Sequence, residues 1–389
     1  MKNKLIRTVL GLLALTIIGC GVFFKWYAAK ENNQSENHNS PTLLTAQGNE
    51  NAGLVVKQRT VANDIKPIQA EKTQNDVTIS ECESPANPDD LLSDKYFDEK
   101  IIDLTNNTEK LINILEQSID VDSLIAHALI TGSNDIGTLT EKFKVLNNDY
   151  PNNLLVSYDL LSSCTTAESA CERSIIDEGI TLDSQNGAVW LLSSLYELNN
   201  NNIELATTSL LEAANAPVYE EYWGEHFSVF ESALSQAGAG NDLPVQIAAM
   251  GYVASAPLPN FNVLVNFCKN THLNRGDILE ACLSMGRQLV NSKSTMLSHF
   301  IGFSLQEAVY KKQNNETQIS QVSTVRKELL KTIGLSEKAN NLAWQSSQRT
   351  YDWIQQIKTM GELAATEYIV DEAIKLSADP NFDPCEISW

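Results

Sequence analysis

The chain repeats itself over residues 149–217, and this repetition constrains its fold more than any other feature. With a shift of 34 residues, Asp149-Tyr-Pro-Asn152 aligns with Asp183-Ser-Gln-Asn186. The positions that follow also agree: Leu155 aligns with Val189, Val156 with Trp190, Leu161 with Leu195, Ile176 with Leu210, and Gly179 with Ala213. A 34-residue period is typical of two-helix units that bury their apolar faces only by stacking on neighbouring units. We therefore expect an all-α fold built from helical hairpins.

The second unit, residues 187–216, resembles a tetratricopeptide (TPR) repeat. The residues that match its bulky and small packing positions are Trp190, Ser194, Ala206, Leu210 and Ala213, and their counterparts in the first unit include Val156 and Gly179. The match is degenerate, because Glu172 stands where an alanine is usual. The resemblance implies a TPR-like α-solenoid, which we expect over residues 91–260, with a concave surface between stacked hairpins.

The N-terminus has the pattern of a membrane anchor. Residues 1–7 form a short basic tail, and an uncharged apolar stretch follows, flanked by Lys25-Trp26-Tyr27. We expect a single-pass transmembrane signal anchor over residues 8–27 in the inner membrane, with the tail in the cytoplasm and the body in the periplasm or on the extracellular side. Two alternatives stay open: a lipoprotein modified at Cys20, or a cleaved signal peptide. All three place the body outside the cytoplasm.

Residues 28–90 show neither helical nor strand periodicity and begin with polar low-complexity sequence, so we expect a disordered linker. The net charge of the chain is −21. The first thirty residues contribute +5 and contain no acid, so the remainder carries −26. Such a body should avoid nucleic acid and anionic headgroups, and it would suit a basic partner.

Six of the seven cysteines lie in the exported body, and an even number in an oxidising compartment predicts disulfides. Their spacing favours two short loops at turns between helices and one long loop that joins the ends of the ordered part. The expected pairs are Cys164–Cys171, Cys268–Cys282 and Cys82–Cys385. Free thiols or a zinc site are the alternatives, although no histidine stands at ligand spacing beside Cys164 or Cys171.

Helix signals continue on both sides of the repeat. A helix should begin near Asn107-Thr108, and Thr138-Leu-Thr-Glu141 has the pattern of a capping box that starts another. No proline lies between Pro259 and Pro380, so residues 261–389 should form a C-terminal helical region. The helices expected there are 277–291, 294–312, 318–333 and 337–377, the last broken at least once.

Metal-site patterns are weak. Glu221, Glu225 and His226 fall at helical spacing and could converge on a metal. We favour the alternative, in which Trp223 and Phe227 form the bulky face of a repeat helix while the two carboxylates face water. His272 and His299, both near the Cys268–Cys282 loop, form a second and weaker candidate.

The sequence contains no Gly-rich phosphate loop, no His-Glu-x-x-His and no Gly-x-Ser-x-Gly, so we name no catalytic, metal or cofactor-binding residue and expect no cofactor. The leading hypothesis is a non-enzymatic scaffold of the cell envelope that binds a protein or peptide. The alternatives are an envelope enzyme or enzyme-accessory subunit with a site in the C-terminal helical region, or a structural stalk. A carboxylate of raised pKa in a C-terminal pocket would favour the enzyme.

Overall fold

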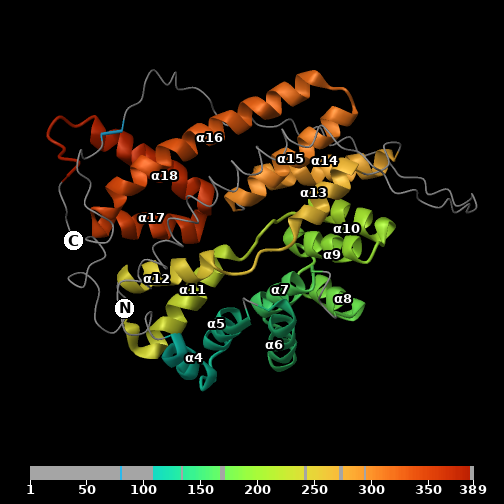
Figure 1. Ribbon diagram of the computed structural model, residues 1–389, viewed down its shortest axis with the longest axis horizontal. Coiled ribbons are helices and arrows are strands. Elements are labelled where there is room, and N and C mark those ends of the chain that lie inside the picture. Colours follow the sequence, from blue (N-terminus) through green and yellow to red (C-terminus); the bar gives the residue numbers. More distant parts are fainter. Residues whose placement is uncertain are drawn as a thin grey trace, which may run out of the picture. The chain divides into compact units, whose positions relative to one another are not determined.

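The computed structural model describes residues 79–80, 108–132, 135–166, 171–240, 243–270, 275–292 and 295–385. In this part of the chain the protein is all-helical, as the sequence predicts (Figure 1). The one strand-like contact among these residues is an isolated parallel bridge between Asn186 and Val218. No described helix is long and apolar enough to cross a membrane, and the anchor expected at residues 8–27 lies outside the described residues.

Within residues 108–149, as far as the structure describes them, three helices precede the repeat: α4 (Thr108–Glu116), α5 (Val121–Gly132) and α6 (Ile136–Asp149). The start of α4 agrees with the sequence. The start expected at the capping box of residues 138–141 was wrong, because α6 begins at Ile136. Asp135 is the N-cap instead, since its side chain accepts a hydrogen bond from the Gly137 amide; a short acid that reaches two residues ahead satisfies the same orphan donors.

The repeated stretch forms two consecutive hairpins. The first pairs α7 (Leu154–Ser163) with α8 (Arg173–Leu182), and the second pairs α9 (Gly187–Asn199) with α10 (Ile203–Asn215). Side-chain amides join residues that are 34 positions apart. Asn186 donates from Nδ2 to the Glu220 carbonyl at 3.0 Å, and Asn199 donates to the Thr165 carbonyl.

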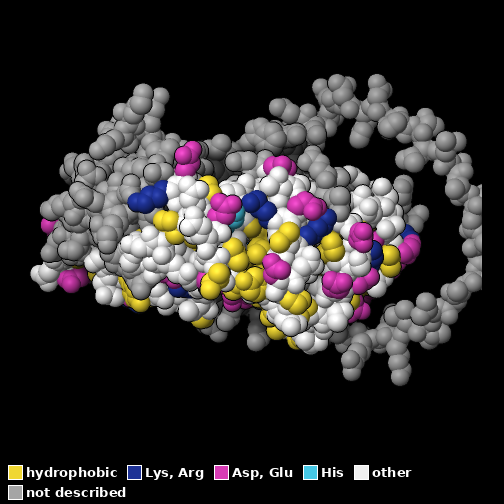
Figure 2. Space-filling view, turned by 90° about the horizontal axis from the view of Figure 1, so that it is seen from below, with side chains coloured by type: hydrophobic (Ala, Val, Ile, Leu, Met, Phe, Trp, Pro, Cys, Tyr) yellow, Lys and Arg dark blue, Asp and Glu magenta, His cyan; other side chains and the backbone are white. Residues whose placement is uncertain are grey.

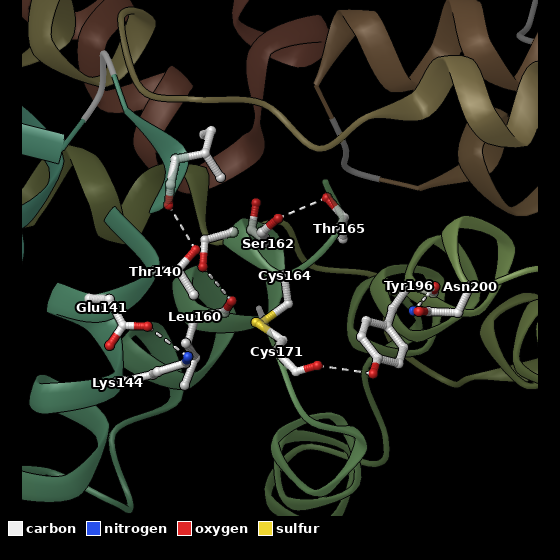
Figure 3. Close-up of a disulfide and its surroundings, with 12 residues drawn as sticks. Thr140, Glu141, Lys144, Leu160, Ser162, Cys164, Thr165, Cys171, Tyr196 and Asn200 are labelled. Atoms are coloured by element: carbon white, nitrogen blue, oxygen red, sulfur yellow. Dashed lines mark hydrogen bonds and ion pairs between the residues drawn. A yellow bond between two sulfur atoms is a disulfide. The ribbon is translucent and has the colours of Figure 1, made fainter. Parts of the chain in front are cut away.

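Disulfides link Cys164 to Cys171 and Cys268 to Cys282, with Cα–Cα distances of 5.6 and 5.9 Å. These are the two short pairs that the sequence analysis proposes. Figure 3 shows the first at the connection between α7 and α8, where the Cys171 carbonyl accepts a hydrogen bond from the Tyr196 hydroxyl at 3.2 Å. Tyr196 belongs to α9, so this connection is tied to the next hairpin.

Helix α11 (Trp223–Leu234) follows the repeat and runs into a π-helical turn, η1 (Ser235–Ala239). Gly238 lies inside this turn with φ +91° and Gly240 caps its end with φ +89°, conformations that favour glycine. Two helices come next, α12 (Leu243–Ala254) and α13 (Phe261–Asn270).

After α13, the described part of the C-terminal region forms five more helices: α14 (Gly276–Asn291), α15 (Met296–Lys312), α16 (Glu316–Trp344), α17 (Ser347–Met360) and α18 (Glu362–Ser377). The helices expected at 277–291 and 294–312 are present. The break expected between residues 333 and 337 was wrong, because α16 is a single helix of 29 residues that runs through this position. A lone Gly334 weakens a helix but does not stop it. The prediction that 337–377 is broken at least once is confirmed, because the helix is interrupted at residues 345–346 and again at Gly361.

The described residues at the N-terminal end touch the C-terminal helices. Ile79 is only 5% exposed, and the Ser80 amide donates to Ser377 Oγ at 2.8 Å. These two residues therefore have fixed contacts, although the predicted linker includes them. The rest of the linker lies outside the described residues. Cys385 is disulfide-bonded, but Cys82 also lies outside them, so the Cys82–Cys385 pair stays a prediction.

Candidate functional site

A cleft of about 480 Å³ lies between α11, α12 and α17, three helices that contact one another in Figure 1. Its volume is within the range of small-molecule and short-peptide sites. Polar side chains dominate the lining. The residues that line it are Ser228, Glu231, Ser232, Ser235, Gln236, Val245, Gln246, Tyr351, Gln355 and Lys358.

Helical periodicity explains why these side chains face one cleft. On α11 and η1, Ser228, Glu231, Ser232 and Ser235 are spaced i, i+3, i+4 and i+7, which places them on one side of the helix. Much of the rest of the helix surface is apolar and buried, with Phe227 beside the polar face and Phe230 behind it. On α17, Tyr351, Gln355 and Lys358 recur at i, i+4 and i+7. Each helix thus packs with one face and gives its polar face to the cleft.

An ion pair joins the two walls. Lys358 Nζ on α17 binds Glu231 Oε2 on α11, and the two side chains are 18% and 19% exposed. The same ammonium lies 5.4 Å from the centroid of the Phe227 ring, within cation–π range. At this end the helices are very close, because a Cβ atom on Gly224 would lie 2.3 Å from the Lys358 carbonyl oxygen. Glycine at 224 therefore sets how near the walls can come.

Gln246 of α12 lines the cleft and has a side-chain acceptor without a hydrogen-bond partner among the described residues. Its side chain lines the cleft and the residue is 9% exposed. Its Oε1 atom is buried and has no hydrogen-bond partner among the described residues. A buried acceptor without a donor costs about 1–3 kcal/mol. The terminal torsion of a glutamine is broad and roughly two-fold, so the oxygen and the amide nitrogen can exchange places.

The rim next to η1 is acidic. Gln236 donates from Nε2 to Asp120 Oδ2 at 2.9 Å and accepts from the Ser123 hydroxyl at 3.1 Å. Burial raises the pKa of the neighbouring Asp122 carboxyl, the Asp120 charge raises it further, and a hydrogen bond from Ser232 opposes both. Two carboxylates of α5 and its N-terminal turn therefore lie behind side chains that line the cleft.

The residues flagged by the sequence as a possible metal site do not converge. His226 turns to Asp159 on α7, with Nε2 2.8 Å from Oδ1. Glu221 accepts hydrogen bonds from the Tyr219 hydroxyl, the Thr295 amide and the Ser298 hydroxyl. The expectation that Glu221 faces water was therefore wrong, since it binds the N-terminal turn of α15, where backbone donors lack partners.

Glu225, in contrast, is exposed, and Phe227 is fully buried. His299 is buried in α15, while His272 lies outside the described residues. No group of three or more histidine, cysteine or acidic residues that could hold a metal occurs in the described residues.

The repeat-packing residues lie inside the hairpins. Val156, Ser194, Ala206, Leu210 and Ala213 are fully buried. Ser194 Oγ donates to the Ala206 carbonyl at 2.9 Å, so the small residue brings α9 close to α10. A Cβ on Gly179 would lie 2.4 Å from Leu161 Cδ1, which shows an equally close approach of α7 and α8.

Two further positions differ from the repeat pattern. Trp190 is only partly buried and donates from Nε1 to the Ser184 carbonyl at 2.9 Å. Glu172 is exposed and is the N-cap of α8. The expectation that Glu172 occupies a packing position was therefore wrong, because α8 begins one residue later.

The sequence analysis did not find the cleft residues. The available signal was the row of small polar residues at positions 228, 231, 232 and 235, beside Phe227 and opposite Phe230, which marks a polar face that needs no apolar neighbour. Its partner row on α17 is 123 positions later in sequence, and no local pattern connects the two. Comparison of the chain with protein-family models, curated proteins and solved structures gives no match.

Proposed function

We propose that the chain is a membrane-tethered, exported helical protein of the cell envelope that binds a peptide or protein segment without catalysis. The tether is the anchor expected at residues 8–27 followed by the linker, and the binding site is the cleft between α11, α12 and α17. In this proposal the helical hairpins form a TPR-like array that supports the cleft.

The observation that carries this proposal is the unpartnered acceptor of Gln246 in a cleft of suitable size. Serine hydroxyls and glutamine amides at spaced positions on two helices can bond the backbone amides of an extended peptide. Tyr351, 43% exposed, adds an aromatic surface at the cleft edge. These groups are suited to bind and orient a segment.

The enzyme alternative has weaker support. Burial raises the pKa of the Glu362 carboxyl, a hydrogen bond from the Met296 amide opposes this, and the Glu221 charge raises it further. Glu362 therefore is a carboxylate of raised pKa in the C-terminal region. However, it accepts from the Met296 amide at 2.7 Å and lies outside the cleft lining. Its contact is that of a helix cap rather than of a general acid.

The test is selection of peptides from a displayed random library by the full chain in detergent. Peptides enriched by the native protein should lose binding to Ser228→Trp, because a bulky indole on the exposed edge of α11 fills the cleft. Ser174→Trp, on the exposed side of α8, is the matched control and should bind as the native chain does. Equal binding by both variants would remove the cleft from the proposal.

A further inference from the structure

The Glu231–Lys358 ion pair indicates what the cleft can accept. From its position we infer that the cleft takes the cationic side chain of a partner segment, a lysine or arginine, whose charged end replaces Lys358 on Glu231. Lys358 then acts as an internal stand-in for the ligand. This inference rests on the proposed function, since it names the chemistry of the segment bound in the same cleft.

The charges around the cleft favour a cation. Lys358 is the one cation among the described residues that line it, and Glu231 already neutralises that charge. Asp120 accepts a hydrogen bond from Gln236, and Asp122 is hydrogen-bonded to Ser232. Two more carboxylates therefore lie directly behind the residues that line the cleft. The net charge close to the cleft is therefore negative, and so is the net charge of residues 31–389, which is −26. An anionic ligand would meet this field as repulsion, whereas a cation would be drawn to it.

The hydrogen-bonding groups favour a cation as well. Ammonium and guanidinium groups have donors and no acceptor, so each donor needs an oxygen. Glu231 supplies a carboxylate, and Gln246 supplies the acceptor that has no donor in the free protein. A bound side chain that also reaches Gln246 would remove the cost of the unpartnered oxygen. Arginine suits the Glu231 carboxylate particularly well, because its donors are held in a planar fork.

The displaced Lys358 would also keep favourable contacts. Its ammonium already lies near the Phe227 ring and can remain there when the carboxylate is taken. The side chain is 18% exposed, so it can reach water without unfolding α17. Exchange of one cation for another costs little free energy, because the Glu231 carboxylate stays paired with a cation and becomes no more buried than before.

The experiment uses two capped five-residue peptides of glycine and serine with one central lysine, free in one and acetylated on its side chain in the other. Binding to the full chain in detergent is measured by calorimetry at low ionic strength. The free lysine should bind about tenfold more tightly than the acetylated one, since a charged hydrogen bond is lost on acetylation. Raising the salt concentration should weaken only the free-lysine peptide.

Three variants separate the local from the general effect of charge. Glu231→Gln should lose the preference for free lysine. Glu212→Gln, an exposed acid of α10 with the same change in net charge, should keep it. Lys358→Met should bind the free-lysine peptide several-fold more tightly than the native chain, because the internal competitor is gone. A gain in affinity cannot come from misfolding, so this variant tests the inference even if Glu231→Gln is unstable.

Equal affinity for the two peptides, no binding of either, or equal losses in Glu231→Gln and Glu212→Gln would each overturn the inference. None of these results would overturn the proposed function, which fails on a different readout, the unchanged binding of library peptides by Ser228→Trp. A neutral segment bound in the cleft would appear as library binding without a preference for free lysine.

Discussion

The imidazole Nε2 of His226 lies 2.8 Å from Asp159 Oδ1, although the two residues are 67 positions apart in sequence. The other ring nitrogen, Nδ1, lies 2.8 Å from the Tyr222 carbonyl oxygen. A carbonyl and a carboxylate only accept hydrogen bonds, so these two contacts favour the protonated imidazole, in which both ring nitrogens donate. The pair joins α11 to α7, and hence the cleft to the repeat.

This pair should make stability fall at alkaline pH. Burial alone would lower the pKa of His226, but the Asp159 charge, the bond to Asp159 and the Tyr222 carbonyl together hold it above the ordinary 6.5. The folded state therefore keeps a proton that the unfolded state releases, so the contribution is complete below about pH 6.5 and is lost as pH rises through the folded-state pKa. Urea unfolding across this range should show a falling midpoint in the native chain and a flatter profile in His226→Gln. A native midpoint that rises above neutrality would contradict the assignment.

His299 should have the opposite effect at acid pH. Burial lowers its pKa to about 4, and a hydrogen bond involving the Val290 backbone opposes this only in part. The unfolded state then binds a proton more readily, so stability falls as pH drops from about 6.5 towards 4. The full loss is at most about 3 kcal/mol. His299→Leu should unfold with a smaller dependence on pH in this window, with Glu212→Gln as a surface control.

Close packing of α14 on α15 should make one glycine irreplaceable. A Cβ on Gly302 would lie 2.7 Å from the Gly286 carbonyl oxygen, and backbone cannot give way as a side chain can. Gly302→Ala should therefore destabilise the protein by about 1–3 kcal/mol. Gly334→Ala is the matched control: a Cβ there meets nothing within 4 Å, so the change should stabilise α16 by about 0.5–1 kcal/mol. Thermal unfolding that moves both variants in the same direction would refute this.

The disulfide between Cys164 and Cys171 should protect a limited part of the chain. Its loop is short, so its loss should cost no more than about 2–3 kcal/mol. We predict that Cys164→Ala with Cys171→Ala shows faster hydrogen exchange within residues 150–220, and no change in α16. Non-reducing peptide mapping must first find the two cysteines joined to each other. Faster exchange spread over the whole chain would show that the hairpins do not open locally.

The surface should keep the protein away from anionic polymers. Figure 2 shows acidic side chains spread around a central group of hydrophobic ones on the face it presents. We expect no retention on heparin or on anionic vesicles at moderate salt by a chain whose N-terminal anchor is already held in detergent. Retention that depends on salt would contradict the charge argument.

Local patterns predicted the helices well, because capping residues, turns and apolar periodicity act within a few positions. The start of α4, the hairpins at residues 149–217 and the two short cysteine pairs all depend on nearby residues. The errors at Asp135 and Gly334 concern choices between competing local signals. The cleft could not be predicted, because Glu231 and Lys358 meet only after α17 folds back on α11. Nothing near either residue in sequence indicates the other.

Two hydrogen bonds from asparagine side chains join residues that are 34 positions apart, and they limit how such a chain can change in length. Asn186 and Asn199 each reach the backbone of an adjacent unit at the same offset, one forward to Glu220 and one back to Thr165. An insertion of a few residues between them lies within both spans, so it would change both offsets without supplying a new partner for either asparagine. A duplication of 34 residues would supply both partners at once. A chain built on these two hairpins would therefore tolerate a change of one whole 34-residue unit better than a smaller change, which would leave side-chain amides unpaired.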